Sequence, residues 1–281
     1  MIGVVAALVA AMSYGVSDFV GGIASRRVAA LRVVIVSYPV ALVVLVAAAA
    51  PLGGTMSTPA VVWGLLSGVG QAFGVWWFYA ALGAGPISVV SPLTAILVAG
   101  LPVGVGLALG ERPSALAGVG VVLALVAVVL VSREASDEDV RPHRFTMKVA
   151  WLTVGAGVAF GMNFVILDQI PTEAKLWPLV LGRVAATVIV LAAALATANL
   201  ARIRGVPLRL ALLAGVLDAV ATVTSLLALQ ASLLSLAGVL IALYPAATVL
   251  LAIVVLRERV TSWQAIGMVL ALSAVALITA G

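Results

Sequence analysis

Apolar segments of about 20 residues follow one another along the whole chain, and they limit the fold more than any other feature. A helix needs about 20 residues to cross a bilayer core of about 30 Å. The chain is 64% hydrophobic and 9% charged, whereas soluble domains carry about 25% charged residues. Strands of a membrane barrel would alternate apolar and polar residues, and these segments do not. The sequence therefore predicts an all-α polytopic membrane protein.

Gly, Pro and charged residues divide the apolar sequence into ten predicted transmembrane helices. These cover 2–22, 32–50, 60–82, 87–109, 114–131, 148–168, 177–197, 208–230, 233–256 and 262–280. One polar stretch, 132–147, splits the chain almost in half and carries the only His. We therefore expect a five-helix repeat at 1–131, a charged soluble linker at 132–147 and a second five-helix repeat at 148–281.

The two halves resemble each other in sequence. At an offset of 147, "GERPSALAGVGVVLALVAVVLV" (110–131) aligns with "RERVTSWQAIGMVLALSAVALI" (257–278), and at an offset of 146 "MSYG" (12–15) aligns with "VAFG" (158–161). Because each half has an odd number of spans, the second half enters the membrane in the opposite orientation. The result is a five-plus-five inverted repeat, and secondary transporters built this way bind their substrate between the repeats, near the midplane.

The distribution of Lys and Arg predicts the orientation in the membrane. Loops after even-numbered spans hold only Arg112 and Lys175. Loops after odd-numbered spans hold twelve: Arg26, Arg27, Arg32, Arg133, Arg141, Arg144, Lys148, Arg202, Arg204, Arg209, Arg257 and Arg259. Since Lys and Arg are retained on the cytoplasmic side, we expect a multi-pass protein of the cytoplasmic membrane with both termini outside.

Asp218 and Arg183 are the ionisable residues that lie deepest in the predicted spans. Asp218 lies near the middle of span eight, and its repeat mate at offset 147 is Gln71 in span three. Arg183 is six residues into span seven, so its depth is close to that of Asp218. Such residues indicate a functional site by default, and we expect the two to pair. A purely structural ion pair is the alternative, although helix association in a membrane needs none.

Five further residues complete the predicted substrate-binding or coupling site, together with Asp218, Arg183 and Gln71. Asp18 and Asp168 lie near the ends of spans one and six, where a plain helix-end charge is the alternative role. Tyr14 precedes Asp18 by one turn, Asn163 lies in span six, and Tyr244 stands beside Pro245 in the middle of span nine. A proline inside a span frees a backbone carbonyl, which is tolerated beside a cavity or a neighbouring helix.

Several classes of function find no support in the sequence. No phosphate-binding loop, metal-ligand cluster or nucleophile triad is present, and the chain has no Cys. The net charge is +5, and the basic residues lie mainly in short loops between the apolar segments. Their position is explained by orientation in the membrane and does not indicate nucleic-acid binding. We therefore predict no enzyme activity and no cofactor, metal or nucleic-acid partner.

The chain resembles the EamA-type family of the drug/metabolite transporter superfamily. The resemblance is clearest in "LLALQASLLSLAGVLIALYPAATVLLAIVVLRERVTSWQAIGMVL" (226–270) and in "FYAALGAGPISVVSPLTAILVAGLPVGVGLALGERPSALAGVGVVL" (78–123), where a span ends in Glu-Arg and a Gly-containing span follows. It implies a secondary transporter, often an exporter of amino acids, metabolites or drugs. It also implies that both termini are cytoplasmic. The count of Lys and Arg places both termini outside, and we follow the count.

The sequence thus predicts a secondary active transporter for a small metabolite, amino acid or drug-like solute, coupled to protons and acting as an exporter by alternating access. Its partners would be the solute, protons and the lipid bilayer. Two alternatives are a membrane scaffold or subunit without transport and an integral-membrane enzyme acting on a lipid phosphate. Polar residues that match between the two halves near the middle of the membrane argue against a scaffold. A lipid-phosphate enzyme would need several His, Asp, Glu or Arg residues clustered at one membrane face, and the sequence shows no such cluster.

Overall fold

The computed structural model describes residues 1–25, 27–84, 87–132, 146–197, 202–256 and 261–281, and within these ranges the regular structure is helical. The α-helices are α1 (Ile2–Ser25), α2 (Ala30–Ala49), α3 (Thr58–Ala84), α4 (Ile87–Ala108), α5 (Ala115–Val131), α6 (Met147–Asp168), α7 (Trp177–Ala196), α8 (Val206–Ala231), α9 (Leu234–Ile241), α10 (Tyr244–Leu256) and α11 (Ser262–Ala280). Two short 3-10 helices, η1 (Ala50–Leu52) and η2 (Thr172–Ala174), precede α3 and α7.

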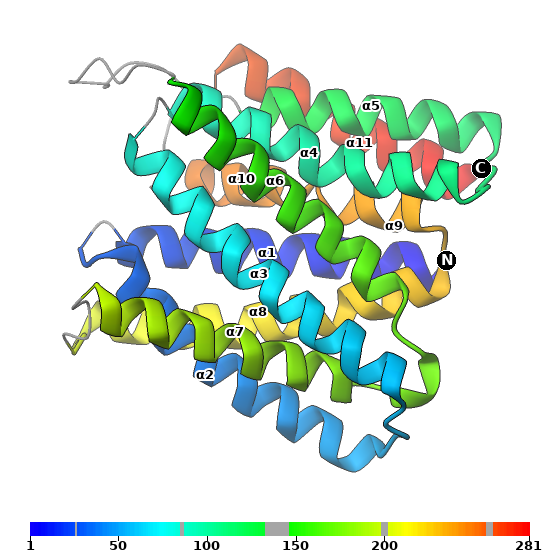
Figure 1. The fold of residues 1–281 in the computed structure, drawn as a ribbon. Helices are drawn as coiled ribbons and strands as arrows, with labels where there is room; N and C mark the ends of the chain where they lie inside the picture. Colours follow the sequence, from blue (N-terminus) through cyan, green and yellow to red (C-terminus); the bar gives the residue numbers. More distant parts are fainter. Residues whose placement is uncertain (26, 85–86, 133–145, 198–201, 257–260) are drawn as a thin grey trace.

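The helices form one bundle and run roughly along a common direction (Figure 1). The pair α5 and α11 packs at one edge of the bundle, and the pair α2 and α7 packs at the other. The remaining helices lie between these pairs, with α1 in the middle of the view. Both termini lie at the same end of the bundle (Figure 1).

The helical architecture predicted from the sequence is confirmed, while the number of spans stays a prediction. Within the described residues, eight segments are long and apolar enough to cross a bilayer, and Leu93–Ala108 and Ala115–Val131 are shorter apolar helices. The predicted ninth span is not continuous, because it breaks at residues 242–243 between α9 and α10, and Pro245 is the second residue of α10. Proline has no backbone N–H to donate within a helix, which accounts for the break. Most of the predicted linker, residues 133–145, lies outside the described residues.

The packing of the helices repeats between the two halves. By their order in the two halves, α1, α2 and α3 correspond to α6, α7 and α8. The contact between α1 and α8 thus corresponds to that between α6 and α3, and the contact between α2 and α8 corresponds to that between α7 and α3. Helix α4 packs on α6, and the corresponding α9 and α10 pack on α1. The pairs α5–α11 and α2–α7 each join equivalent helices of the two halves. This pattern is the one expected of an inverted repeat whose halves interlock.

Individual glycines show the same symmetry. An added Cβ at Gly15 would lie 2.7 Å from the carbonyl oxygen of Tyr244, and one at Gly161 would lie 2.7 Å from that of Leu97. The two glycines are 146 residues apart, and Tyr244 and Leu97 are 147 apart. Small residues at these positions allow the helix backbones to approach closely. The offsets found in the sequence therefore describe equivalent contacts in space.

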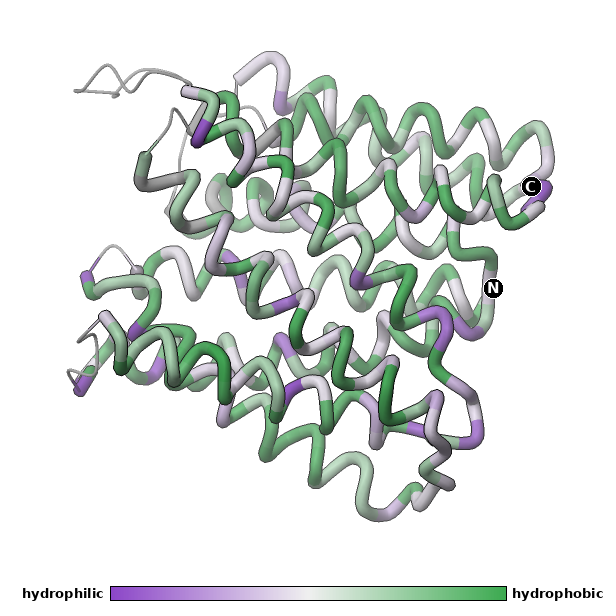
Figure 2. The backbone as a smooth tube through the Cα atoms, in the orientation of Figure 1, coloured by the Kyte–Doolittle hydropathy of each residue, from purple (hydrophilic) through white to green (hydrophobic). Residues whose placement is uncertain are grey.

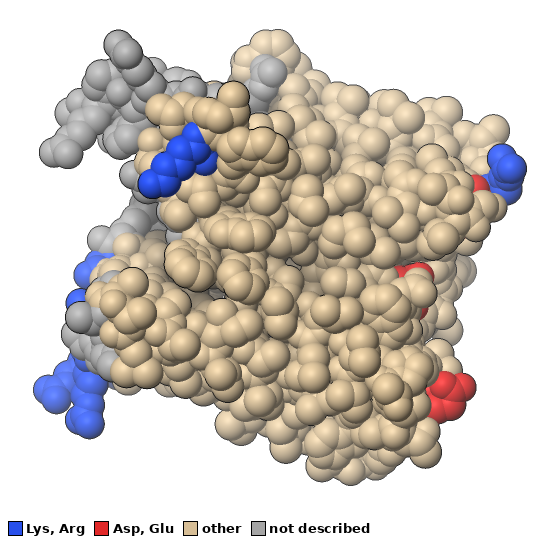
Figure 3. All heavy atoms as spheres, in the orientation of Figure 1, with Lys and Arg blue, Asp and Glu red and all other residues tan. Residues whose placement is uncertain are grey.

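The surface is polar mainly at the two ends of the bundle. Hydrophobic residues cover most of the length of the helices (Figure 2), and large apolar side chains such as Val43, Val188 and Leu272 are exposed. Lys and Arg gather mainly at the end opposite the termini, and the acidic residues seen in this view lie at the end with the termini (Figure 3). An apolar belt between two polar ends is suited to a bilayer.

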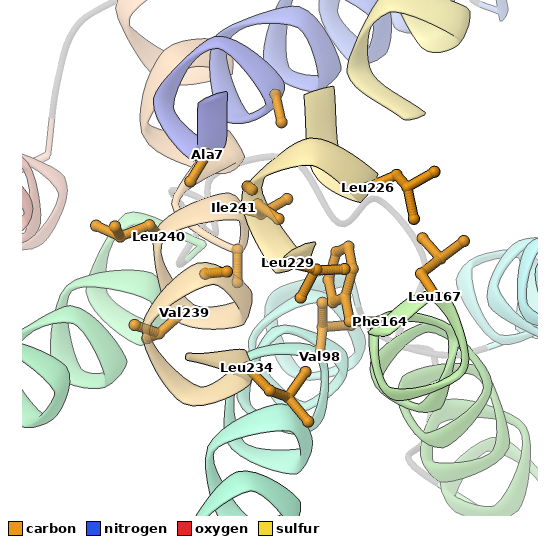
Figure 4. Packing of buried hydrophobic residues seen from close by; sticks show 14 of the residues in the cluster. Ala7, Val98, Phe164, Leu167, Leu226, Leu229, Leu234, Val239, Leu240 and Ile241 are labelled. Atoms are coloured by element: carbon orange, nitrogen blue, oxygen red, sulfur yellow. The ribbon is translucent and has the colours of Figure 1, made fainter. Parts of the chain in front are cut away.

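Helix α9 is packed in the core between the two halves. Its residues Leu234, Val239, Leu240 and Ile241 join a buried cluster with side chains of α1, α4, α6 and α8 (Figure 4). The carboxylate of Glu111, in the loop after α4, accepts hydrogen bonds from the backbone N–H groups of Leu234 (2.6 Å) and Ser235 (2.9 Å). The first N–H groups of a helix have no partner within the helix, so a residue of the first repeat caps a helix of the second.

Candidate functional site

Arg183 of α7 and Asp218 of α8 form an ion pair between guanidinium Nη2 and carboxylate Oδ2. The Arg183 side chain is 1% exposed and that of Asp218 is 19% exposed. Their similar depth in consecutive antiparallel spans led us to expect this contact. Removing such charges from water is costly unless the pair is well placed and has further polar partners, and the Arg183 guanidinium has two, the Thr222 hydroxyl and the Tyr38 ring.

Thr222 links the ion pair to the first repeat. Arg183 Nη2 donates to Thr222 Oγ1 at 3.3 Å, and this hydroxyl donates to the Asp218 carbonyl oxygen at 2.8 Å. The Tyr14 hydroxyl lies 3.4 Å from Thr222 Oγ1. Because the single hydroxyl hydrogen of Thr222 is directed to Asp218, Tyr14 is the donor in this contact. Helices α1, α7 and α8 are thus joined through one hydroxyl group.

Tyr38 of α2 supports the guanidinium from a second direction. The Arg183 Cζ atom lies 4.7 Å from the centroid of the Tyr38 ring, within the range of a cation–π interaction. Both side chains are buried. The guanidinium is therefore fixed by a carboxylate, a hydroxyl and an aromatic face that come from α8 and α2.

A small polar cavity lies beside the ion pair, where α3 of the first repeat meets α6, α7 and α8 of the second. It is lined by Ser67, Gln71, Asn163, Leu167, Leu179, Gly182, Arg183 and Thr222. Arg183 Nη1 and Asn163 Oδ1 are buried and have no hydrogen-bond partner among the described residues. The cavity has room for about one water molecule. A donor and an acceptor that both lack protein partners thus line one cavity at the junction of the repeats.

Tyr14, Tyr244 and Asp18 form a second part of the site on the other side of Tyr14. The rings of Tyr14 and Tyr244 meet edge to face, with their centroids 6.3 Å apart. Tyr244 is the first residue of α10, after the break in the ninth span. The Asp18 side chain is exposed, and it lies close enough to Asp218 and Tyr244 to act on both electrostatically. Asp18 is thus near residues of both α8 and α10.

Asp168 does not join the other predicted site residues. It is the last residue of α6 and accepts a hydrogen bond of 3.1 Å from Gln169 Nε2. Its electrostatic neighbour is Glu111, which caps α9 near the end of the bundle that holds the termini. Glu258, the repeat mate of Glu111, lies outside the described residues.

The structure adds residues that the sequence interpretation missed. Thr222 and Ser67 each lie four residues from a predicted site residue, Asp218 and Gln71, so helical spacing places them on the same face. Nothing in the sequence pairs Tyr38 with Arg183, because the contact joins separate spans. Across the described ranges, no group of three His, Cys, Asp or Glu residues is placed to hold a metal ion.

Comparisons with known proteins extend this description. A comparison with curated protein sequences finds no match. One solved crystal structure, described only as that of a protein, superposes with a TM-score of 0.78 at 18% identity, over 99% of this chain and 96% of the other. This similarity concerns the fold. The model of the EamA-like transporter family matches residues 1–133 and again residues 147–280. The chain therefore belongs to the EamA-like transporter family and is a multi-pass membrane protein.

Proposed function

We propose that the protein is a secondary active transporter, which moves a small metabolite, amino acid or drug-like solute across the cytoplasmic membrane by alternating access. The observation that carries the proposal is the buried Arg183–Asp218 pair beside a polar cavity between the two repeats. Charged residues inside a membrane are rare and costly, and they mark substrate or ion pathways. Inverted-repeat transporters hold their sites at such a junction.

We also propose that protons are the coupling ion and that Asp218 carries the proton. A carboxylate bound to a guanidinium loses that partner's attraction on protonation, so protonation would release Asp218 from Arg183. The released pair would allow α7 and α8 to move relative to each other. Export is the direction that the resemblance implies.

The experiment is counterflow exchange in proteoliposomes made from the purified full-length chain. Vesicles are loaded in turn with unlabelled amino acids, aromatic amines and aromatic carboxylates, and exchange of the labelled compound is measured. We expect exchange above that of protein-free vesicles for at least one compound, and at least a tenfold loss in Arg183→Met and Asp218→Asn. Glu173→Gln, an exposed acidic residue outside the site, serves as the control and should exchange like the wild type.

Absence of exchange for every compound in the wild type would contradict the proposal. Exchange at the wild-type rate in both Arg183→Met and Asp218→Asn would show that the ion pair takes no part in transport. Proton coupling is measured in the same vesicles, as accumulation of the exchanged compound under an imposed pH gradient. If accumulation does not depend on the pH gradient, protons are not the coupling ion.

A further inference from the structure

Resting on the proposed transport function, we infer that the site selects a cationic solute, a protonated amine with an aromatic or other apolar body, and that Asp18 is its counter-ion. The inference rests on a difference between two charged residues of the site: Arg183 is paired and enclosed, whereas Asp18 is exposed. It narrows the solute classes named above to one.

Arg183 is not available to a carboxylate of a solute in this conformation. Its guanidinium is held by Asp218, Thr222 and the Tyr38 ring, and its side chain is 1% exposed. The cavity beside Nη1 has room for about one water molecule, which is too small for an amino or organic acid. The positive charge of the site is therefore neutralised and enclosed.

Asp18 is in the opposite situation. Its side chain is exposed, and no described residue forms a salt bridge with it. A Cβ added at Gly21 or Gly22, one turn further along α1, would meet no atom within 4 Å, so this face of the helix borders open space. Charged residues of membrane spans face the bundle interior or a water-filled cavity and not lipid. We therefore expect the exposed Asp18 carboxylate to contact water and not lipid.

The two carboxylates of the site are not equally paired. Among the described residues, Arg183 pairs with Asp218, whereas Asp18 lies close enough to Asp218 to act on it electrostatically and forms no salt bridge. When ionised, Asp18 therefore carries a negative charge that no described residue pairs. In a medium of low dielectric constant this charge attracts a cation and repels an anion.

Two aromatic rings beside Asp18 favour the same class of solute. Tyr14 lies one turn before Asp18 on α1, and its ring contacts Tyr244 edge to face. Both tyrosines are half-buried, so each residue is partly accessible. Aromatic faces attract organic cations, and the apolar surroundings suit an apolar body. A carboxylate next to two tyrosines is thus chemically matched to a protonated amine.

The test compares three probes of one shape and different charge: 2-phenylethylammonium, 2-phenylethanol and 3-phenylpropionate. Binding to the purified full-length protein is measured as the shift of its thermal unfolding midpoint, followed by tryptophan fluorescence. We expect the cation to raise the midpoint and the other two to have little effect. Asp18→Asn should weaken binding of the cation at least tenfold, Asp18→Glu should retain it, and Tyr244→Leu should weaken it several-fold. Glu173→Gln is the control and should bind like the wild type.

The unfolding midpoint of each variant without probe reports whether it is folded. The inference is overturned if the carboxylate binds more tightly than the amine, if none of the three binds, or if folded Asp18→Asn binds the amine like the wild type. Exchange of carboxylates that depends on Arg183 in the proteoliposomes would likewise contradict cation selection, while leaving transport itself established. The experiments can therefore contradict cation selection without contradicting transport.

Discussion

Among the described residues, Arg183 is the largest side chain that the bundle buries completely, and its charge is tolerated because Asp218 is paired with it. Replacing one member of a buried ion pair leaves the other charge without a partner and costs about 3–5 kcal/mol. We therefore expect Arg183→Met to lower the free energy of unfolding by about this amount. Replacing both residues with apolar ones often costs little, so Arg183→Met with Asp218→Leu should recover most of the loss.

The free energy of unfolding of these variants is measured in mixed micelles by titration with a denaturing detergent. Arg183→Lys is the matched control, because it keeps the charge and loses the planar guanidinium that contacts Tyr38. It should lie between the wild type and Arg183→Met. A double variant that loses as much stability as the two single variants together would show that the two charges are not energetically coupled.

At the scale of the helix, α9 depends on Glu111 for its first N–H groups. Each hydrogen bond to a charged group contributes about 1.5–3 kcal/mol, and Glu111 accepts two. We expect Glu111→Ala to destabilise the N-terminal turn of α9 and to accelerate hydrogen exchange at Leu234 and Ser235. Glu111→Gln retains one acceptor oxygen, so exchange should be accelerated less.

Glu173→Ala, the control, removes another acidic residue whose side chain is exposed. It should leave exchange at Leu234 and Ser235 unchanged. Equal exchange rates in the wild type and in Glu111→Ala would mean that the carboxylate does not cap α9.

Close packing of α3 on α7 gives a second prediction for the helices. A Cβ at Gly68 would lie 2.0 Å from the carbonyl oxygen of Gly182, whereas one at Gly100 would meet nothing within 4 Å. Overpacking costs about 1–3 kcal/mol, so Gly68→Ala should lower the thermal unfolding midpoint by several degrees. Gly100→Ala is the matched control and should not lower it, because alanine favours a helix over glycine. Equal midpoints would contradict the close approach of the two helices.

At the scale of the whole molecule, the sequence predicted the helical class and the symmetry between the halves. Apolar length identifies helices in a membrane because every backbone polar group must be paired within the segment. The offsets of 146 and 147 anticipated the equivalent contacts of Gly15 and Gly161. The similar depth of Arg183 and Asp218 in consecutive spans was enough to predict that they pair.

Other features of the site depend on contacts that no local pattern encodes. Tyr38 reaches Arg183, and Glu111 caps α9, across segments that are distant in the sequence. Hydropathy alone does not separate α9 from α10, because both halves of the broken span are equally apolar. Depth placed Asp168 near an end of its span, and the structure places it beside Glu111, away from the ion pair.

The central claim is that the site between the repeats is reached alternately from the two sides of the membrane. The chain has no Cys, so a single introduced cysteine reports one position without further changes. Ser67 lines the cavity beside Arg183, and Ser67→Cys is a conservative replacement. Ser57→Cys, at an exposed position before α3, is the control and should react only from the side that its loop faces.

The measurement is the rate at which a membrane-impermeant thiol reagent modifies Ser67→Cys in right-side-out and in inside-out vesicles. The account predicts modification from both sides, because each conformation of a transporter opens the site to one of them. Modification from neither side, or from one side alone, would contradict alternating access at this site.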